Sequence, residues 1–241
     1  MEIRRLHANL NDFNDGVFEI SGDEFNYAVK VLRQKQGFSV IVNVGDGYDY
    51  LGVITEIKKD RLCVKVSEKV ENPATPKNKI TLYQGSCKLG KNDFIVQKAV
   101  ELGVDKFVPF VSRNCAETKF ASDRANKIAL ESAKQCGSAY LTEVENVISF
   151  DDMLKRFSTF DNVLFAYEYE KKNRIKDCDL SGKNIALVVG AEGGFTEEEA
   201  QEAKDNRAQI VTLGKRILRA ETASIVSCAL LLDRLGELDY D

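Results

Sequence analysis

Short strands dominate the hydrophobic pattern in the first third of the chain. Residues 38–44 are rich in β-branched side chains, and residues 48–57 resume the same pattern after the turn residues Gly45-Asp46-Gly47. Residues 61–66 alternate polar and apolar side chains, whereas residues 23–32 have the spacing of a helix. Strands at this spacing predict a small β-barrel.

The pattern changes after a proline-containing segment, residues 71–76, which holds two of the three prolines of the chain, Pro73 and Pro76. Proline cannot continue a helix, and it stiffens a linker. We therefore expect a domain boundary at this segment, with one domain formed by residues 1–72 and a second formed by residues 73–241.

The second part of the chain alternates strand and helix patterns. Strands are expected at residues 79–83, 106–110, 162–167, 184–189 and 209–213. Helices are expected at residues 92–103, 122–137 and 221–235, and a further one after Thr196, where Glu199 completes a capping box. This succession predicts an α/β domain with a mainly parallel sheet.

Composition and charge narrow the function classes. Six cysteines without a CxxC pair favour reduced, buried thiols, and the single histidine, His7, excludes a His-rich metal site. No apolar run approaches the roughly 18 residues of a membrane span, and no apolar stretch follows the N-terminus, so we expect a cytoplasmic protein. With a net charge of −4, any binding of nucleic acid must rely on local basic patches.

Two loops after predicted strands carry candidate chemistry, because parallel α/β sheets bind ligands beyond the carboxyl ends of their strands. The first loop has the sequence Gly190-Ala191-Glu192-Gly193-Gly194-Phe195. Its glycines allow a ligand to approach closely, and its glutamate disfavours a phosphate but suits a ligand with hydroxyl groups or positive charge. A purely structural turn is the alternative interpretation of this segment.

The second loop comprises residues 213–223 and leads into the last predicted helix. It places three cations near the end of a strand: Lys215, Arg216 and Arg219. Glu221 lies where the helix dipole favours a carboxylate, so it is either a functional residue or an ordinary helix-start residue. The apolar residues Ile217 and Leu218 are unusual in a loop unless they pack on something such as an adenine ring.

Together these motifs resemble the ribosomal small-subunit RNA uridine-N3 methyltransferases of the SPOUT, or α/β-knot, superfamily. The resemblance covers nearly the whole chain, and its strongest segments are residues 190–196 and 213–223. Residues 97–104, 131–137 and 31–33 also look like segments of this family. Several motifs in the right order make the resemblance specific.

The resemblance implies a fold, a cofactor and partners. The implied fold is a small PUA-like β-barrel that binds RNA, followed by a trefoil-knot methyltransferase domain with a mainly parallel sheet. S-adenosyl-L-methionine is the implied cofactor, and the chain is expected to form a homodimer, without a metal or a membrane partner. The implied substrate is one uridine in the decoding region of 16S rRNA, as RNA or in the assembled small ribosomal subunit, and the product is N3-methyluridine.

Site residues are carried over from the motifs of the family. The implied cofactor-binding residues are Tyr167, Glu168, Gly190, Glu192, Gly193, Gly194, Leu213, Gly214, Ile217 and Leu218. The candidates for contact with RNA are Arg4, Arg5, Arg33, Lys88 and Arg216. Arg219 and Glu221 are the candidate catalytic residues. N3 of uracil must lose a proton, so Arg219 would stabilise the developing anion, and Glu221 would accept the proton or orient Arg219.

Three positions depart from the family pattern. Ala191 stands where proline is usual, which should loosen the loop, and Asn26 and Ser138 stand where histidine and arginine are common. Two alternatives remain open: a knotted methyltransferase with another target, such as a tRNA ribose 2′-hydroxyl, and a non-catalytic RNA-binding assembly factor. The predicted N-terminal barrel and its residues 31–33 weigh against the first alternative, and the intact glycine and arginine loops weigh against the second.

Overall fold

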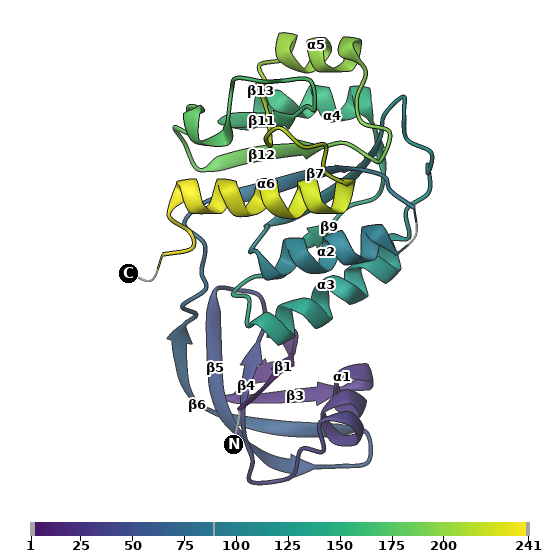
Figure 1. The fold of residues 1–241 in the computed structure, drawn as a ribbon. Coiled ribbons are helices and arrows are strands. Elements are labelled where there is room, and N and C mark those ends of the chain that lie inside the picture. The colour runs from purple at the N-terminus through teal and green to yellow at the C-terminus, as the bar shows by residue number, and fades with distance from the viewer. Residues whose placement is uncertain (1–2, 89, 240–241) are drawn as a thin grey trace. The chain divides into compact units, whose positions relative to one another are not determined.

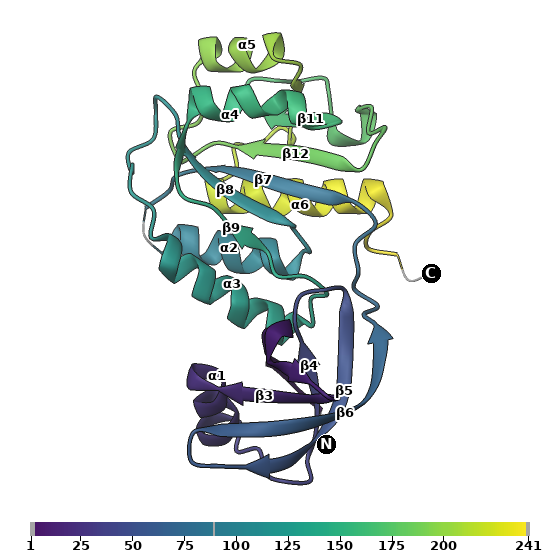
Figure 2. The same cartoon turned by 180° about the vertical axis from the view of Figure 1, so that it is seen from behind.

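The computed structural model describes residues 3–88 and 90–239, which form two compact units. The first unit contains the chain up to Thr75, together with Ala133–Leu141. The second unit contains Pro76–Ser132 and the chain from Thr142 onward. A short segment from the later part of the sequence therefore completes the unit that the N-terminal residues form (Figures 1 and 2).

The first unit is built on a mixed six-stranded sheet in the order β1-β4-β5-β6-β3-β2. Its strands are β1 (Arg4–His7), β2 (Phe13–Asn14), β3 (Val17–Ser21), β4 (Ser39–Asn43), β5 (Tyr48–Ile57) and β6 (Arg61–Glu71). Side chains alternate between the faces of a strand, and one face supplies a core in which several large side chains have no exposed surface: Leu6, Phe18, Ile54 and Leu62. The helix α1 (Gly22–Asn26) and a π-helical turn (Tyr27–Val31) occupy the predicted helical segment.

The second unit is built on a seven-stranded sheet in the order β10-β8-β7-β12-β11-β13, with β9 beside β8. Its strands are β7 (Lys79–Gly85), β8 (Lys106–Val111), β9 (Glu143–Val144), β10 (Ile148–Ser149), β11 (Asn162–Ala166), β12 (Asn184–Val189) and β13 (Gln209–Val211). Every pairing in this sheet among the described residues is parallel. The predicted parallel α/β domain is confirmed.

Helices cover both faces of the parallel sheet (Figures 1 and 2). One face carries α4 (Phe150–Arg156) and α5 (Glu197–Asp205). The other face carries α6 (Ala220–Leu235), which packs against α2 (Lys91–Glu101). The helix α3 (Ser122–Cys136) lies beside α2. In β12, Ala186 and Val188 belong to the cluster under α4 and α5. Ile185 and Leu187, equally buried, point to the other face by alternation, which explains why this strand is apolar throughout.

Several local predictions can be compared with the structure directly. Thr196 caps α5 as predicted: its hydroxyl accepts from the backbone N–H of Glu199, and the Glu199 carboxylate accepts from the N–H of Thr196. None of the six cysteines forms a disulfide, and four are buried as predicted, but Cys115 is half-buried and Cys136, at the end of α3, is exposed. No helix of the described residues is long and apolar enough to cross a membrane.

Candidate functional site

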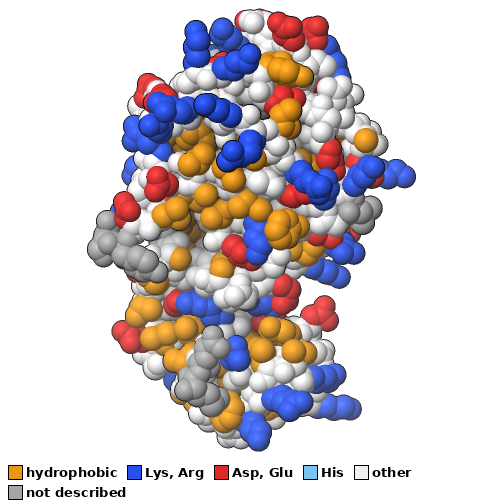
Figure 3. Space-filling model, in the orientation of Figure 1, with side chains coloured by type: hydrophobic (Ala, Val, Ile, Leu, Met, Phe, Trp, Pro, Cys, Tyr) orange, Lys and Arg blue, Asp and Glu red, His pale blue; other side chains and the backbone are white. Residues whose placement is uncertain are grey.

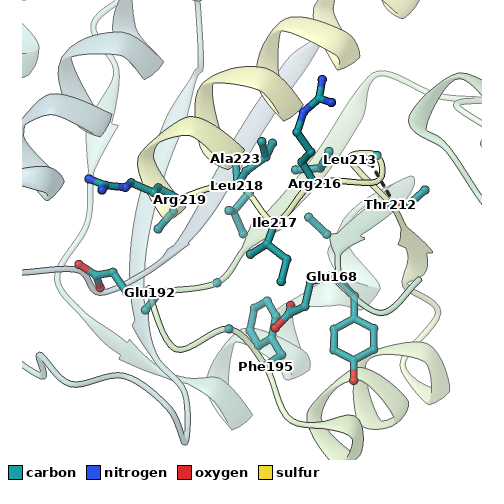
Figure 4. Close-up of a pocket in the computed structure, with 18 of the residues that line it drawn as sticks. Glu168, Glu192, Phe195, Thr212, Leu213, Arg216, Ile217, Leu218, Arg219 and Ala223 are labelled. Atoms are coloured by element: carbon teal, nitrogen blue, oxygen red, sulfur yellow. Dashed lines mark hydrogen bonds between the residues drawn. The ribbon is translucent and has the colours of Figure 1, made fainter. Parts of the chain in front are cut away.

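Four neighbouring strands end at one edge of the parallel sheet, and the segments that follow them meet there. Because β7, β12, β11 and β13 are adjacent, their carboxyl ends share this edge. A pocket of about 350 Å³ lies among these segments (Figure 4), a volume typical of sites for small ligands. Its lining comprises residues 166–168, 189–192, 194, 195 and 212–220, together with Lys91 and Ala223.

A buried glutamine fixes the start of the glycine loop. Gln84, at the end of β7, has no exposed surface, and its Nε2 donates to the carbonyl oxygens of Gly85 (3.0 Å) and Gly190 (3.1 Å). Its Oε1 accepts a hydrogen bond from the hydroxyl of Ser224 on α6. Gly85 allows the loop to lie close, since a Cβ there would overlap the backbone of Ala191. One side chain therefore ties β7, the glycine loop and α6 together.

The glycine loop turns sharply before α5. Gly194 has a φ of +63°, and its N–H donates to the carbonyl oxygen of Ala191 at 3.0 Å. A Cβ at Gly194 would overlap the carboxylate of Glu168, which follows β11. Phe195 then anchors the loop, because its ring is 3% exposed and its centroid lies 4.2 Å from that of Phe165. The glycine at this position thus permits both the turn and the close approach of Glu168.

The basic loop forms the opposite wall of the pocket. Ile217 is 86% exposed, and in Figure 4 its side chain and that of Glu168 point into the space between the loops. Arg216 and Arg219 point away from one another. Arg219 is the N-cap residue of α6, so the positive end of the helix dipole adds to its charge. This border of the pocket is suited to an anion.

Lys91 forms ion pairs with carboxylates from both loops. Its Nζ lies 3.0 Å from Oε1 of Glu192 and 3.4 Å from Oε2 of Glu221. The hydrogen bond to Glu192 raises the pKa of Lys91. Burial opposes ionisation of Glu192, but a backbone hydrogen bond and Lys91 outweigh it and lower the pKa of this carboxyl. Oε2 of Glu221 is buried, and its contact with Lys91, at 3.4 Å, is longer than the contact between Lys91 and Glu192.

The pocket brings most of the predicted cofactor-binding residues together. Those in its lining are Tyr167, Glu168, Gly190, Glu192, Gly194, Leu213, Gly214, Ile217 and Leu218. Gly193 lies outside the lining: its carbonyl oxygen accepts from Nδ2 of Asn114 at 3.1 Å, and a Cβ on it would lie 2.5 Å from the Asn114 carbonyl oxygen. Arg219 lines the pocket, whereas Glu221 is not part of the lining and pairs with Lys91, which is part of it.

The predicted RNA-contact residues are spread over both units. Four of them are exposed: Arg4, Arg33, Lys88 and Arg216. The fifth, Arg5, donates two hydrogen bonds of 2.6 and 2.8 Å to the carboxylate of Asp49, which is 4% exposed. This pairing within the first unit gives Arg5 a structural role that the sequence did not indicate.

A second hollow, of about 770 Å³, adjoins the pocket and shares Glu168 and the start of the basic loop with it. Its lining contains five cationic side chains: Lys171, Arg174, Lys176, Lys215 and Arg234. Three of these belong to the basic segment that follows β11. Within residues 3–88 and 90–239, no group of three or more His, Cys, Asp or Glu side chains is placed to hold a metal ion.

Comparison with known proteins gives one consistent result. Residues 74–232 match the model of the RNA methyltransferase domain family, and residues 20–67 match the RNA methyltransferase PUA domain. The chain is 32% identical to the ribosomal RNA small subunit methyltransferase E of Bacillus subtilis, covering 86% of each chain. It is 36% identical to that of Mesomycoplasma hyopneumoniae, covering 90% of this chain and 94% of the relative.

A solved structure of the same kind is similar throughout. The ribosomal RNA small subunit methyltransferase E of Neisseria gonorrhoeae, bound to S-adenosyl methionine, is 26% identical and aligns with a TM-score of 0.86. The alignment covers 96% of this chain and 98% of that one.

Proposed function

Because the chain belongs to the family of the ribosomal RNA small subunit methyltransferases E, we propose that it transfers a methyl group from S-adenosyl-L-methionine to N3 of one uridine in the decoding region of 16S rRNA. The observation that carries the proposal is the pocket at the carboxyl edge of the sheet, which is lined by the glycine loop on one side and by the basic loop on the other. The glycine loop suits a cationic cofactor, and the basic loop suits a uracil that becomes anionic.

The residues of the pocket fit S-adenosyl-L-methionine, which supplies a methyl group on a positively charged sulfonium. Glu168 and Glu192 offer carboxylates to its positive charges and ribose hydroxyls. Leu213 and Leu218 are half-buried apolar residues that can pack on a purine ring. Gly214 has a φ of +115°, and a Cβ there would meet no atom within 4 Å, so this part of the wall is open to a ligand.

Methylation at N3 requires that the N3–H proton leave the uracil. The guanidinium of Arg219 stands at the N-terminus of α6, where it can stabilise the negative charge that spreads over the uracil carbonyl oxygens. The Oε2 atom of Glu221 is buried, and within the described residues its contact is the ion pair with Lys91, so this oxygen is suited to accept the proton. Its ion pair is with Lys91, which favours the role of proton acceptor over that of orienting Arg219.

RNA must reach this pocket with the target base out of its pair, because N3 lies on the pairing edge. We assign docking of the RNA to the first unit, through Arg4 and Arg33, and to the pocket border, through Lys88 and Arg216. The cations of the adjoining hollow would neutralise phosphates of the same RNA. In this proposal the N-terminal domain, residues 1–72, binds RNA, and the domain from residue 73 binds the cofactor. The reaction takes place in the cytoplasm, where ribosomes assemble.

We also propose a homodimer through α6. One face of this helix is buried against the sheet, yet Ile225, Val226 and Ala229 are only half-buried and Leu230 is 46% exposed. Figure 3 shows hydrophobic side chains gathered over α6, with Lys and Arg side chains beside them. An exposed apolar strip with a basic border is typical of a surface that a second protein chain covers.

The function can be tested with purified protein, S-adenosyl-L-methionine carrying a deuterated methyl group, and either 16S rRNA or small ribosomal subunits. Nucleosides from the digested RNA are then separated and identified by mass spectrometry. We expect the label in 3-methyluridine only. Label in a ribose 2′-O-methyl nucleoside would move the reaction to another target, and RNA binding without transfer or cofactor binding would indicate an assembly factor.

A further inference from the structure

We propose that Lys91 is a positioning residue of the methyl-transfer site, which joins the glycine loop to the start of α6 by pairing with Glu192 and Glu221. The inference rests on the proposed function. Lys91 itself begins α2, in the segment that follows β7, so the pairing connects the ends of three strands of the sheet.

The geometry explains why a cation is needed at this point. Oxygens of Glu192 and Glu221 both lie within 3.4 Å of the same nitrogen, so the two carboxylates are near neighbours. Like charges this close disfavour each other's ionisation, whereas an ammonium between them favours it. Without the Lys91 charge, one carboxylate would take up a proton more readily or turn away, and the two loops would lose their link.

The other charged and titratable groups around this cluster do not substitute for Lys91. Burial, with the charge of Glu192 adding to it, raises the pKa of the Cys87 thiol to about 12, so this thiol is neutral at working pH. Lys88 offers Glu192 a backbone hydrogen bond. Asp93, in the same helical turn as Lys91, pairs with Arg124 at 2.7 Å. Arg219 forms no ion pair with either carboxylate in the described part of the chain.

The three side chains are between 19 and 33% exposed, and ion pairs of this kind add little to folding stability. We therefore expect these ion pairs to affect the reaction, through the positions of the side chains, more than they affect folding stability. Glu192 borders the pocket for a cationic cofactor, and Glu221 holds the oxygen suited to receive the N3 proton. Lys91 therefore acts through these two residues, and its loss should affect turnover and its pH dependence while leaving the fold intact.

The test compares Lys91→Met, Lys91→Arg and a matched control, Lys98→Met. Lys98 lies on the same helix and also pairs with a carboxylate, that of Glu101 at 2.8 Å, but it does not line the pocket. In Lys91→Met we expect kcat to fall roughly tenfold and the acid limb of its pH profile to move to higher pH, because Glu192 protonates more readily once the cation is gone. Lys91→Arg should keep kcat and the pH profile close to those of the wild type, and Lys98→Met should change neither kcat nor the pH profile.

A second measurement does not depend on turnover. Carbon-13 NMR of the glutamate carboxyls reports the ionisation of Glu192, and we expect this carboxyl to titrate at higher pH in Lys91→Met than in the wild type, because Lys91 is one of the groups that lower its pKa. An unchanged titration, or a pH profile that is unchanged while thermal stability falls, would overturn the inference. If the wild-type protein makes no 3-methyluridine, the proposed function fails, while the carboxyl titration still decides the role of Lys91.

Discussion

Replacing Gly194 with alanine should separate the cofactor wall from the rest of the fold. At a φ of +63°, a residue with a Cβ costs roughly 1–2 kcal/mol in backbone strain. The new Cβ would also overlap Oε1 of Glu168, so this carboxylate must retreat by about 1.5 Å to reach an ordinary contact distance. If Glu168 binds a positive group of the cofactor, losing that charged hydrogen bond costs about 1.5–3 kcal/mol, so affinity should fall roughly ten- to a hundredfold.

The matched control is Gly37→Ala in the first unit. Gly37 has a φ of +86°, and a Cβ there would meet nothing within 4 Å, so this variant carries the backbone strain without the steric clash. Calorimetric titration with S-adenosyl-L-methionine and thermal unfolding should be measured on both variants. Similar losses of stability are expected, but only Gly194→Ala should lose affinity. Normal affinity in Gly194→Ala would refute the assignment of this loop and Glu168 to the cofactor.

Three further outcomes follow from the site. Arg219→Ala should bind S-adenosyl-L-methionine within about threefold of wild type yet lose about 10²-fold in kcat, as expected when one preorganised charge is removed; lost cofactor affinity with normal turnover would make Arg219 a binding residue. Gln84→Leu leaves the Gly190 carbonyl and the Ser224 hydroxyl without the partner that Gln84 provides. Chemical denaturation should therefore show a loss of about 1–3 kcal/mol in the free energy of unfolding, and unchanged stability would contradict the role of Gln84. Leu230→Glu should give a monomer by light scattering, and a persistent dimer would place the interface elsewhere.

The sequence was most informative where a local pattern determines the structure. The apolar run of β12, the helix start at Thr196 and the two loops after β12 and β13 could all be predicted, because periodicity, capping and strand-end loops are local properties. One strand of the first unit has no such local signal in the sequence. The strand β1 is a four-residue edge strand, and no turn signal or long alternation marks it.

Residues whose role depends on long-range neighbours could not be predicted in the same way. Lys91 and Gln84 belong to the site because β7 lies beside β12, and strand order cannot be read from hydrophobic periodicity. The pairing of Arg5 with Asp49, 44 residues away in the chain, could not be predicted either, and contact between Arg5 and RNA stays a prediction. The return of Ala133–Leu141 to the first unit is likewise a property of the folded chain alone.

The central claim is most directly tested by mass spectrometry of 16S rRNA from the source organism, with and without this protein. Digests of the decoding region should show one 3-methyluridine that disappears when the protein is deleted. The wild-type protein should restore it, and the Arg219→Ala variant should not. A decoding region that keeps its 3-methyluridine in the deletion strain, or one that loses a methyl group from a different atom, would contradict the assignment of uridine N3 methylation to this protein.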